Sequence, residues 1–242
     1  MKGNVAAVSS VSGTGVAPVL ELRDVHAGYG PFRALFGVSF SLPVAGVVAL
    51  LGSNGAGKTT IARVASGLVM PTEGAVLVDG VEFTGKRPWE FARQGFVHSP
   101  EGRSVFGSLT VSENLQLALR FRHKATLATC VERAYALFPR LGERRGQLAG
   151  TLSGGEQRML ALARVMVDEP RVLIADELSL GLAPIVVDEV YETLRSIQAA
   201  GTALLIVEQH VRHALAIAET VVMLDRGRVQ FDGPVSAYPH TR

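Results

Sequence analysis

The sequence has few of the features that mark a disulfide-stabilised, membrane-spanning or nucleic-acid-binding protein. One cysteine, Cys130, among 242 residues excludes an internal disulfide and a cysteine-based metal cluster. No apolar run approaches the roughly 18–20 residues of a membrane-spanning helix. The formal net charge of +2 is too small to indicate a nucleic-acid partner. We expect a protein of the reducing cytoplasm, and we interpret residues 1–18 as a flexible tail because they lack the apolar run of a secretory signal.

What the sequence does contain is a glycine-rich loop between a buried-strand pattern, Gly46–Leu51, and a helical pattern, Ile61–Leu68. The loop matches G-x-x-x-x-G-K-[ST], the P-loop or Walker A pattern, and consists of Gly52, Ser53, Asn54, Gly55, Ala56, Gly57, Lys58 and Thr59, followed by Thr60. Glycines let the backbone turn tightly, so that its N–H groups form an anion-binding nest at the start of the next helix. We expect Lys58 to reach the β- and γ-phosphates of a nucleotide and the Thr59 hydroxyl to bind Mg²⁺.

A pair of acidic residues follows a short apolar run later in the chain. The apolar run Val172–Ala175 predicts a buried strand that ends at Asp176. We expect this strand to lie next to the P-loop strand. A carboxylate at that position can hold Mg²⁺, usually through water. Glu177 comes next, where it can polarise an attacking water as a general base. The alternative is a solvated acidic turn, which the P-loop makes the weaker interpretation.

A second helix start also has the features of a phosphate site. Leu152–Gln157 contains Ser153 and Glu156 at the spacing of a capping box. Gly154 and Gly155 expose the first N–H groups of the predicted helix. The alternative is an ordinary capped helix. Two such helix starts in one small chain are difficult to bring to the same ATP molecule. We therefore expect the second to contact a nucleotide that another subunit binds.

With these motifs the chain resembles the ATP-binding subunits of ABC transporters over about residues 19–236. Leu152–Gln157 resembles the family's signature sequence, LSGGQ or LSGGEQ. The resemblance implies that ATP and Mg²⁺ bind between the P-loop of one subunit and the signature of another, stacked head to tail. It also implies nucleotide contacts from Gly52–Thr60 and Ser153–Glu156, and stacking of Tyr29 on adenine. The alternative for Tyr29 is an aromatic residue of a turn that packs over the hydrophobic core.

Several short stretches resemble, more narrowly, one of the two unlike ATPases of branched-chain amino acid importers. They are Val25–Gly30, Pro100–Arg103, Leu109–Val111, Glu113–Leu115, Ser179–Pro184 and Val207–Gln209. This resemblance implies a heterodimer with a second ATP-binding subunit, or a homodimer if that partner is missing. It further implies multi-span membrane permease subunits contacted near Glu101–Leu109, an indirect link to a solute-binding protein, and a peripheral location at the cytoplasmic face of the membrane.

Four features depart from the general ABC pattern. Glu101 stands where most of the family has a Gln, although a carboxylate can still bind Mg²⁺. Leu178 and Ala183 replace a Pro and an Asp that usually follow the catalytic Glu. Gln209 occupies the position of the γ-phosphate-sensing His, and His210 follows one residue later, so either can serve as the catalytic switch residue. For His210 a surface-loop histidine is the alternative, and this P-loop can then belong to the weaker of two composite sites.

The expected fold is α/β, with a P-loop NTPase core, a mainly parallel sheet, N-terminal antiparallel strands and a helical subdomain inserted at about residues 88–165. Residues 19–242 form a single ABC ATPase domain in this interpretation. The expected function is hydrolysis of ATP to ADP and phosphate, coupled to import of branched-chain amino acids or related small solutes. Two alternatives stay open: a soluble ABC-type ATPase, and an ATP-gated dimerisation module with weak hydrolysis.

Overall fold

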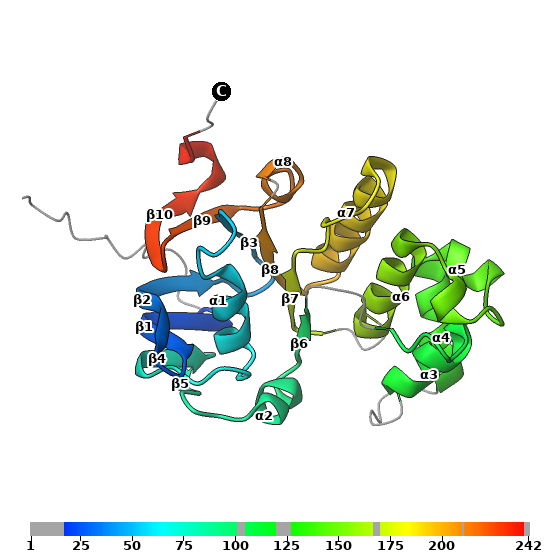
Figure 1. Ribbon diagram of the computed structural model, residues 1–242, viewed down its shortest axis with the longest axis horizontal. Helices are drawn as coiled ribbons and strands as arrows, with labels where there is room; N and C mark the ends of the chain where they lie inside the picture. Colours follow the sequence, from blue (N-terminus) through cyan, green and yellow to red (C-terminus); the bar gives the residue numbers. More distant parts are fainter. Residues whose placement is uncertain (1–16, 101–104, 120–126, 167–169, 210, 240–242) are drawn as a thin grey trace, which may run out of the picture.

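The computed structural model describes residues 17–100, 105–119, 127–166, 170–209 and 211–239 (Figure 1). Its N-terminal part is a four-stranded antiparallel sheet. The strands lie side by side in the order β2 (Phe32–Leu42), β1 (Leu20–Tyr29), β4 (Glu73–Val78) and β5 (Val81–Glu82). The turn at Asp79 and Gly80 joins β4 to β5, as its Asp-Gly sequence predicts.

The second sheet has six strands and carries the loops that concern function. In spatial order they are β10 (Arg228–Pro234), β9 (Thr220–Asp225), β3 (Val47–Gly52), β8 (Ala203–Glu208), β7 (Val172–Asp176) and β6 (Phe96–Ser99). The strands from β9 to β6 run parallel, whereas β10 pairs antiparallel with β9. Every residue of β3, β7 and β8 is buried, as expected for strands of a parallel sheet that is covered on both faces.

Two hydrophobic cores lie on opposite faces of this sheet. The helix α1 (Lys58–Ala65) and the antiparallel sheet pack on one face, and α6 (Gly154–Met166) and α7 (Pro184–Ala199) pack on the other. Strand β3 divides its side chains between the two faces: Val48 and Leu50 belong to the α1 core, and their neighbours along the strand to the α6 core. The helices that follow the P-loop and the signature sequence are therefore separated by the sheet.

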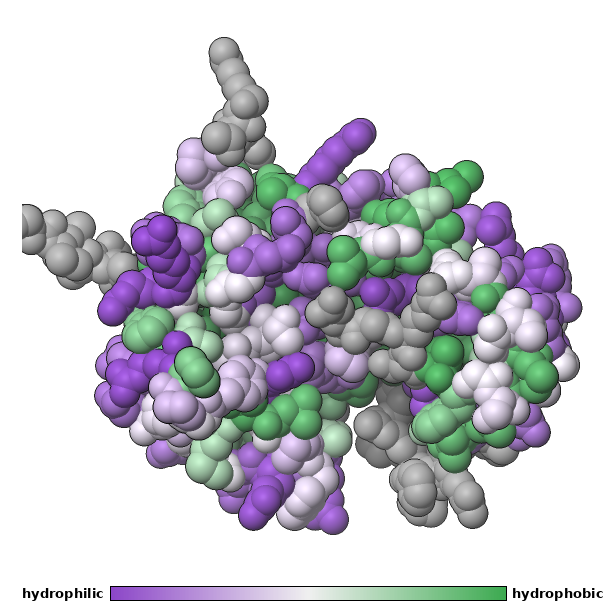
Figure 2. All heavy atoms as spheres, in the orientation of Figure 1, coloured by the Kyte–Doolittle hydropathy of each residue, from purple (hydrophilic) through white to green (hydrophobic). Residues whose placement is uncertain are grey.

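A helical region lies to one side of the six-stranded sheet, at the right of Figure 1. Its described elements before α6 are α3 (Val111–Leu119), α4 (Leu127–Leu137), α5 (Pro139–Glu143) and a 3₁₀ turn at Ala149–Thr151. The shorter elements elsewhere are α2 (Pro88–Arg93), α8 (Val211–Leu215) and a 3₁₀ turn at Val235–Ala237. Hydrophilic and hydrophobic residues are interspersed over the face shown in Figure 2. No helix in the described ranges is both long and apolar enough to cross a bilayer.

The capping box that precedes α3 forms as its sequence predicts. The Glu113 carboxylate accepts hydrogen bonds from the Thr110 N–H at 2.7 Å and from the Thr110 hydroxyl at 2.8 Å. In return, the Glu113 N–H donates to the Thr110 hydroxyl oxygen at 3.2 Å. These bonds satisfy donors that the first turn of a helix leaves unpaired. The helix α3 begins at Val111, directly after Thr110.

Two predictions about the six-stranded sheet are wrong. Residues 88–98 were expected to be mostly helical. Pro88–Arg93 does form α2, but Phe96–Ser99 forms β6, which pairs with β7. A strand of the six-stranded sheet therefore lies between α2 and the helices from α3 onward. The strand that ends at Asp176 was expected beside the P-loop strand, but β8 lies between β3 and β7. Both errors concern pairing between distant strands, which local periodicity does not report.

One further prediction differs at the end of a segment, and another falls mostly on residues that the structure does not describe. The helical pattern was extended to Leu68, yet α1 ends at Ala65 and Leu68 is exposed. The predicted tail, residues 1–18, lies outside the described residues except for its last two positions, 17 and 18. The overall fold class, an α/β core with a mainly parallel sheet and an antiparallel N-terminal sheet, is confirmed.

Candidate functional site

The P-loop joins β3 to α1 in a conformation that only certain residues can adopt. Gly57 caps α1 with φ at 106°, in the left-handed region that disfavours a side chain. A Cβ atom added at Gly52 would lie 2.5 Å from the Leu224 carbonyl oxygen of β9. The loop is also tied to the turn between β9 and β10, because the Gly227 N–H donates to the Ala56 carbonyl at 2.8 Å. Neighbouring strands therefore fix the shape of the loop.

Exposure differs along the predicted nucleotide-binding residues. The loop tip, formed by Ser53, Asn54 and Gly55, is exposed to solvent. At the start of α1, Thr59 is half-buried and Thr60 is buried. The backbone of the tip, where the predicted anion nest lies, is thus accessible to a ligand from solution.

Lys58 links the P-loop to the acidic pair at the end of β7. Its side chain is only 4% exposed, and its Nζ donates to the carbonyl oxygens of Gly52 at 3.0 Å and Ser53 at 3.1 Å. The same Nζ lies 3.4 Å from Oε1 of Glu177. A buried ammonium needs such partners, since desolvation penalises an isolated charge. The structure therefore brings together the lysine of one motif and the carboxylate of the other, although β8 separates their strands.

The backbone of Glu177 is held in an unusual conformation. Its φ of 50° is left-handed, which is uncommon for a residue with a side chain. The Glu177 N–H donates to the Val207 carbonyl at 2.8 Å, and its carbonyl accepts from Nη2 of Arg158 at 3.1 Å. Arg158 lies on α6, so the helix that follows the signature sequence directly contacts the loop after β7. Asp176, the last residue of β7, is fully buried.

Glu208, at the end of β8, is a buried acid that the sequence interpretation did not assign to the site. Its carboxylate accepts hydrogen bonds from the Ser179 N–H at 3.0 Å and the Ser179 hydroxyl at 2.8 Å. Burial raises the pKa of Glu208, and the nearby Glu177 carboxylate adds to this rise, whereas the bonds from Ser179 oppose it. The sequence signal that could have identified Glu208 is its position as an acidic residue directly after the apolar run 203–207.

Three predicted site residues lie elsewhere or are not described. Gln209 follows Glu208 and is exposed, and His210 and Glu101 lie outside the described residues.

His98, on β6, is a second member of the site region that the sequence interpretation missed. Its side chain is 7% exposed, and its Nε2 lies 4.0 Å from Oδ2 of Asp176. Its Nδ1 lies 3.1 Å from the Ser66 hydroxyl, just beyond the end of α1. Burial, with a smaller contribution from the Arg63 charge, lowers the pKa of His98 to about 4. No local sequence pattern predicted this position of His98, because β6 itself was not predicted.

The signature sequence begins α6 with the predicted capping box. The Glu156 carboxylate accepts from the Ser153 N–H at 2.9 Å and from its hydroxyl at 2.8 Å. The other carboxylate oxygen of Glu156 lies 2.6 Å from Nε of Arg144. Burial opposes ionisation of Glu156, but the bonds from Ser153 and Arg144 outweigh it and lower its pKa. The Glu156 side chain thus caps its own helix, next to Gly154 and Gly155 at the helix start.

Tyr29 stands at the end of β1, close to α1. Its ring is partly exposed, and its hydroxyl accepts a hydrogen bond from Nη1 of Arg63 at 3.0 Å. The Arg63 guanidinium also lies 5.7 Å from the centre of the ring. Because Arg63 belongs to the helix that the P-loop begins, this contact places the aromatic ring beside the P-loop helix with part of its surface accessible.

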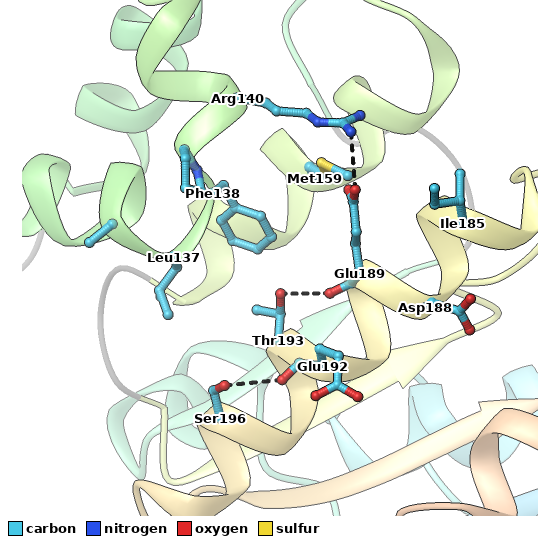
Figure 3. A pocket seen from close by; sticks show the side chains of 12 residues that line it. Leu137, Phe138, Arg140, Met159, Ile185, Asp188, Glu189, Glu192, Thr193 and Ser196 are labelled. Atoms are coloured by element: carbon cyan, nitrogen blue, oxygen red, sulfur yellow. Dashed lines mark hydrogen bonds and ion pairs between the residues drawn. The ribbon is translucent and has the colours of Figure 1, made fainter.

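A separate hollow of about 650 Å³ lies between α4, α5 and α7 (Figure 3). Phe138 and Met159 contribute apolar surface to it. Arg140 reaches across from α5 and forms an ion pair with Glu189 of α7 at 3.2 Å. The residues of the P-loop, the acidic pair and the signature start are not among those that line it, so the hollow is distinct from the candidate nucleotide site.

Comparisons with known proteins agree on one family. The ABC transporter family model matches residues 35–179. The high-affinity branched-chain amino acid transport ATP-binding protein BraG of Pseudomonas aeruginosa is 37% identical over 87% of this chain and 91% of its own. The probable branched-chain amino acid transport ATP-binding protein LivF of Archaeoglobus fulgidus is 33% identical, covering 89% and 92%. BraF, also of Pseudomonas aeruginosa and similarly named, is 29% identical, covering 89% and 91%.

Solved structures agree with these sequence relatives. An ATP-binding subunit of an ABC transporter superposes with a TM-score of 0.80 at 29% identity, covering 89% of this chain and 90% of that one. A nucleotide-free ATP-binding cassette from an ABC transporter has a TM-score of 0.80 at 24% identity, covering 91% and 96%, and supports the fold alone.

Proposed function

The chain belongs to the ABC transporter family as an ATP-binding ATPase subunit, and we propose that it powers an importer of branched-chain amino acids or related small solutes. One observation carries the assignment of the catalytic site: the Lys58 ammonium lies 3.4 Å from the Glu177 carboxylate, joining the P-loop to the end of β7. The proposed solute class is supported by the names of BraG and LivF, which match over most of the chain.

In the proposed mechanism, each group acts on the ATP polyphosphate or on water. The backbone of Gly52–Thr60 and the ammonium of Lys58 hold the phosphates, and Tyr29 stacks on the adenine. Glu177 polarises the attacking water as a general base. The ion pair between Lys58 and Glu177 keeps both groups in place until phosphate oxygens compete for the ammonium.

Mg²⁺ fits the donors that the chain offers beside the P-loop. The Thr59 hydroxyl and the Asp176 carboxylate are hard oxygen ligands of the kind that Mg²⁺ prefers. Asp176 is fully buried at the end of its strand, where a nearby cation offsets the cost of desolvating its charge. When bound, the ion neutralises charge on the phosphates. Glu101 is a third proposed ligand, and its role stays a prediction.

We further propose that the nucleotide is shared between two subunits stacked head to tail. This arrangement is supported by the positions of α1 and α6 on opposite faces of the sheet, since one P-loop then requires the signature residues Ser153–Glu156 of another chain. The similarity to both BraG and BraF of one organism favours an unlike partner, with a homodimer as the alternative. Multi-span permease subunits then bind near Glu101–Leu109 at the cytoplasmic face of the membrane, and a solute-binding protein acts through them.

A second candidate function rests on one observation. Gln209 is exposed directly after β8, and the family resemblance puts it at the position of the γ-phosphate-sensing His. A residue that cannot titrate there favours an ATP-gated dimerisation module with weak hydrolysis. ATP turnover measured on the assembled complex separates this module from an efficient ATPase.

The proposed function is tested by purifying this chain from its native membranes in a mild detergent and identifying the bound proteins by mass spectrometry. Two multi-span proteins and a second ATPase are expected, and the associated solute-binding protein then identifies the solute class. Recovery of ribosomal or DNA-repair proteins, without membrane subunits, would instead support a soluble ABC-type ATPase.

A further inference from the structure

His98 and Asp176 lie on the same face of the six-stranded sheet. In the parallel pairing of β6 with β7, His98 is the partner of Ile174, two residues before Asp176. Ile174 belongs to the core that contains α1. Because side chains two residues apart share a face of a strand, His98 and Asp176 both face α1. Their closest atoms, Nε2 and Oδ2, are 4.0 Å apart.

The hydrogen bond of His98 to Ser66 determines which ring nitrogen carries the proton. The Ser66 hydroxyl lies 2.9 Å from the Ala62 carbonyl and 3.2 Å from the Arg63 carbonyl, two groups that can only accept. Its single proton therefore goes to a helix carbonyl, and its oxygen accepts from His98 Nδ1–H at 3.1 Å. This assignment leaves Nε2 with a lone pair that is aimed toward Asp176.

Nε2 of His98 and the Asp176 carboxylate are then two acceptors that face each other. Among the described residues, Nε2 has no hydrogen-bond partner, and its side chain is more than nine-tenths buried. A direct hydrogen bond at 4.0 Å is too long. One water that donates a bond of about 2.8 Å to each atom would span about 4–4.5 Å, which matches this separation.

We propose that His98 is a positioning residue of the nucleotide site, in which Nε2 and the Asp176 carboxylate share one water molecule. This water orients the carboxylate toward the Mg²⁺ ion, and Ser66 anchors the ring to α1. The inference rests on the proposed function, since it assigns a role to His98 only if Asp176 serves the metal. It explains why a polar ring whose Nε2 has no protein partner among the described residues is buried at this position.

The test measures Mn²⁺ binding by electron paramagnetic resonance, in the presence of a non-hydrolysable ATP analogue, for the full-length chain. His98→Leu removes the acceptor and should weaken Mn²⁺ binding by about 10- to 100-fold, as is typical for the loss of a group that orients a metal ligand. His98→Gln places an amide oxygen near the position of Nε2 and should restore part of the affinity. Nucleotide affinity measured in a chelator should stay within about two-fold of wild type, because the metal is absent.

His26→Leu is a matched control. His26 also lies beside an aspartate, with Nε2 at 3.6 Å from Oδ1 of Asp24, but on β1 of the antiparallel sheet. This variant should bind Mn²⁺ as wild type does. Unchanged Mn²⁺ binding in folded His98→Leu would overturn the inference while leaving the proposed function intact. A wild-type chain that binds neither nucleotide nor Mn²⁺ would overturn the proposed function itself.

A second measurement does not depend on a variant that folds. Nitrogen-15 NMR of the histidine rings in the wild-type protein reports which nitrogen carries the proton. An unprotonated Nε2 and a protonated Nδ1 for His98 support the inference. A protonated Nε2 would overturn it, since the ring would then donate toward Asp176 and could not share a water as a second acceptor.

Discussion

The glycine-containing starts of α1 and α6 are built in different ways. The start of α6 is capped by residues close to it in the sequence. The Glu156 carboxylate accepts hydrogen bonds from Ser153, three positions earlier, and from Arg144, twelve positions earlier. The start of α1 depends instead on contacts with distant segments. Lys58 forms an ion pair with Glu177, which follows β7, and the P-loop accepts a hydrogen bond from the turn between β9 and β10. A local cap supplies N–H groups, whereas a catalytic site also needs charges that converge from several strands.

The largest expected effect comes from removing the charge that Glu177 supplies to the α1 site. Glu177→Gln should lower ATP turnover by about 10²- to 10⁴-fold, as for other general bases, while ATP still binds. The protein should therefore be held in an ATP-bound closed dimer, which size-exclusion chromatography detects. A variant that stays monomeric with ATP, both alone and with its partner ATPase, would contradict the shared-site arrangement.

A smaller loss is expected when the P-loop lysine is removed. Lys58→Met takes away the ammonium that contacts two loop carbonyls and Glu177. Nucleotide affinity should fall by about 10- to 100-fold, the usual size for a charge-assisted contact. Binding of a fluorescent ATP analogue measures this change. If the affinity of a folded variant is unchanged, Lys58 does not contact the phosphates.

The capping boxes at Thr110 and Ser153 allow a matched comparison. Ser153→Ala and Thr110→Ala each remove one cap, and each should lower the free energy of unfolding by about 0.5–2 kcal/mol, as measured by urea denaturation. Only Ser153→Ala should also lower ATP turnover in the assembled complex, because α6 is proposed to face a nucleotide and α3 is not. Equal effects of the two variants on turnover would show that α6 has no special role.

The smallest effect concerns pH and the buried Glu208. Burial raises the pKa of Glu208 in the folded protein above the ordinary value of 4.5. The folded state therefore binds the proton more tightly than the unfolded state. This contribution to the free energy of unfolding is fully present below the unfolded-state pKa and is lost as the pH rises through the folded-state pKa. Glu208→Gln removes this titration. The free energy of unfolding, followed from about pH 4.5 upward, should then fall less steeply than in wild type. Identical slopes would show that Glu208 titrates alike in both states.

Much of the fold was predictable because it depends on short-range patterns. The apolar run of β7 predicted a buried strand, and the P-loop predicted the strand, turn and helix around Lys58. The nucleotide-binding motifs, Gly52–Thr60 and Ser153–Glu156, were identified in the same way. The order of the strands was not predictable, since β8 pairs with β3 through residues more than a hundred positions apart.

The sequence by itself determined the helix caps, the glycine-rich turn and the identity of the family, because each depends on residues within a few positions of one another. Only the tertiary structure decided that His98 faces Asp176, that Ser179 bonds to Glu208 and that α1 and α6 lie on opposite faces of the sheet. The physical reason is that these contacts follow from strand pairing and from burial on a chosen face. Strand pairing and the buried face of each strand are determined by the packing of the whole core rather than by any one segment.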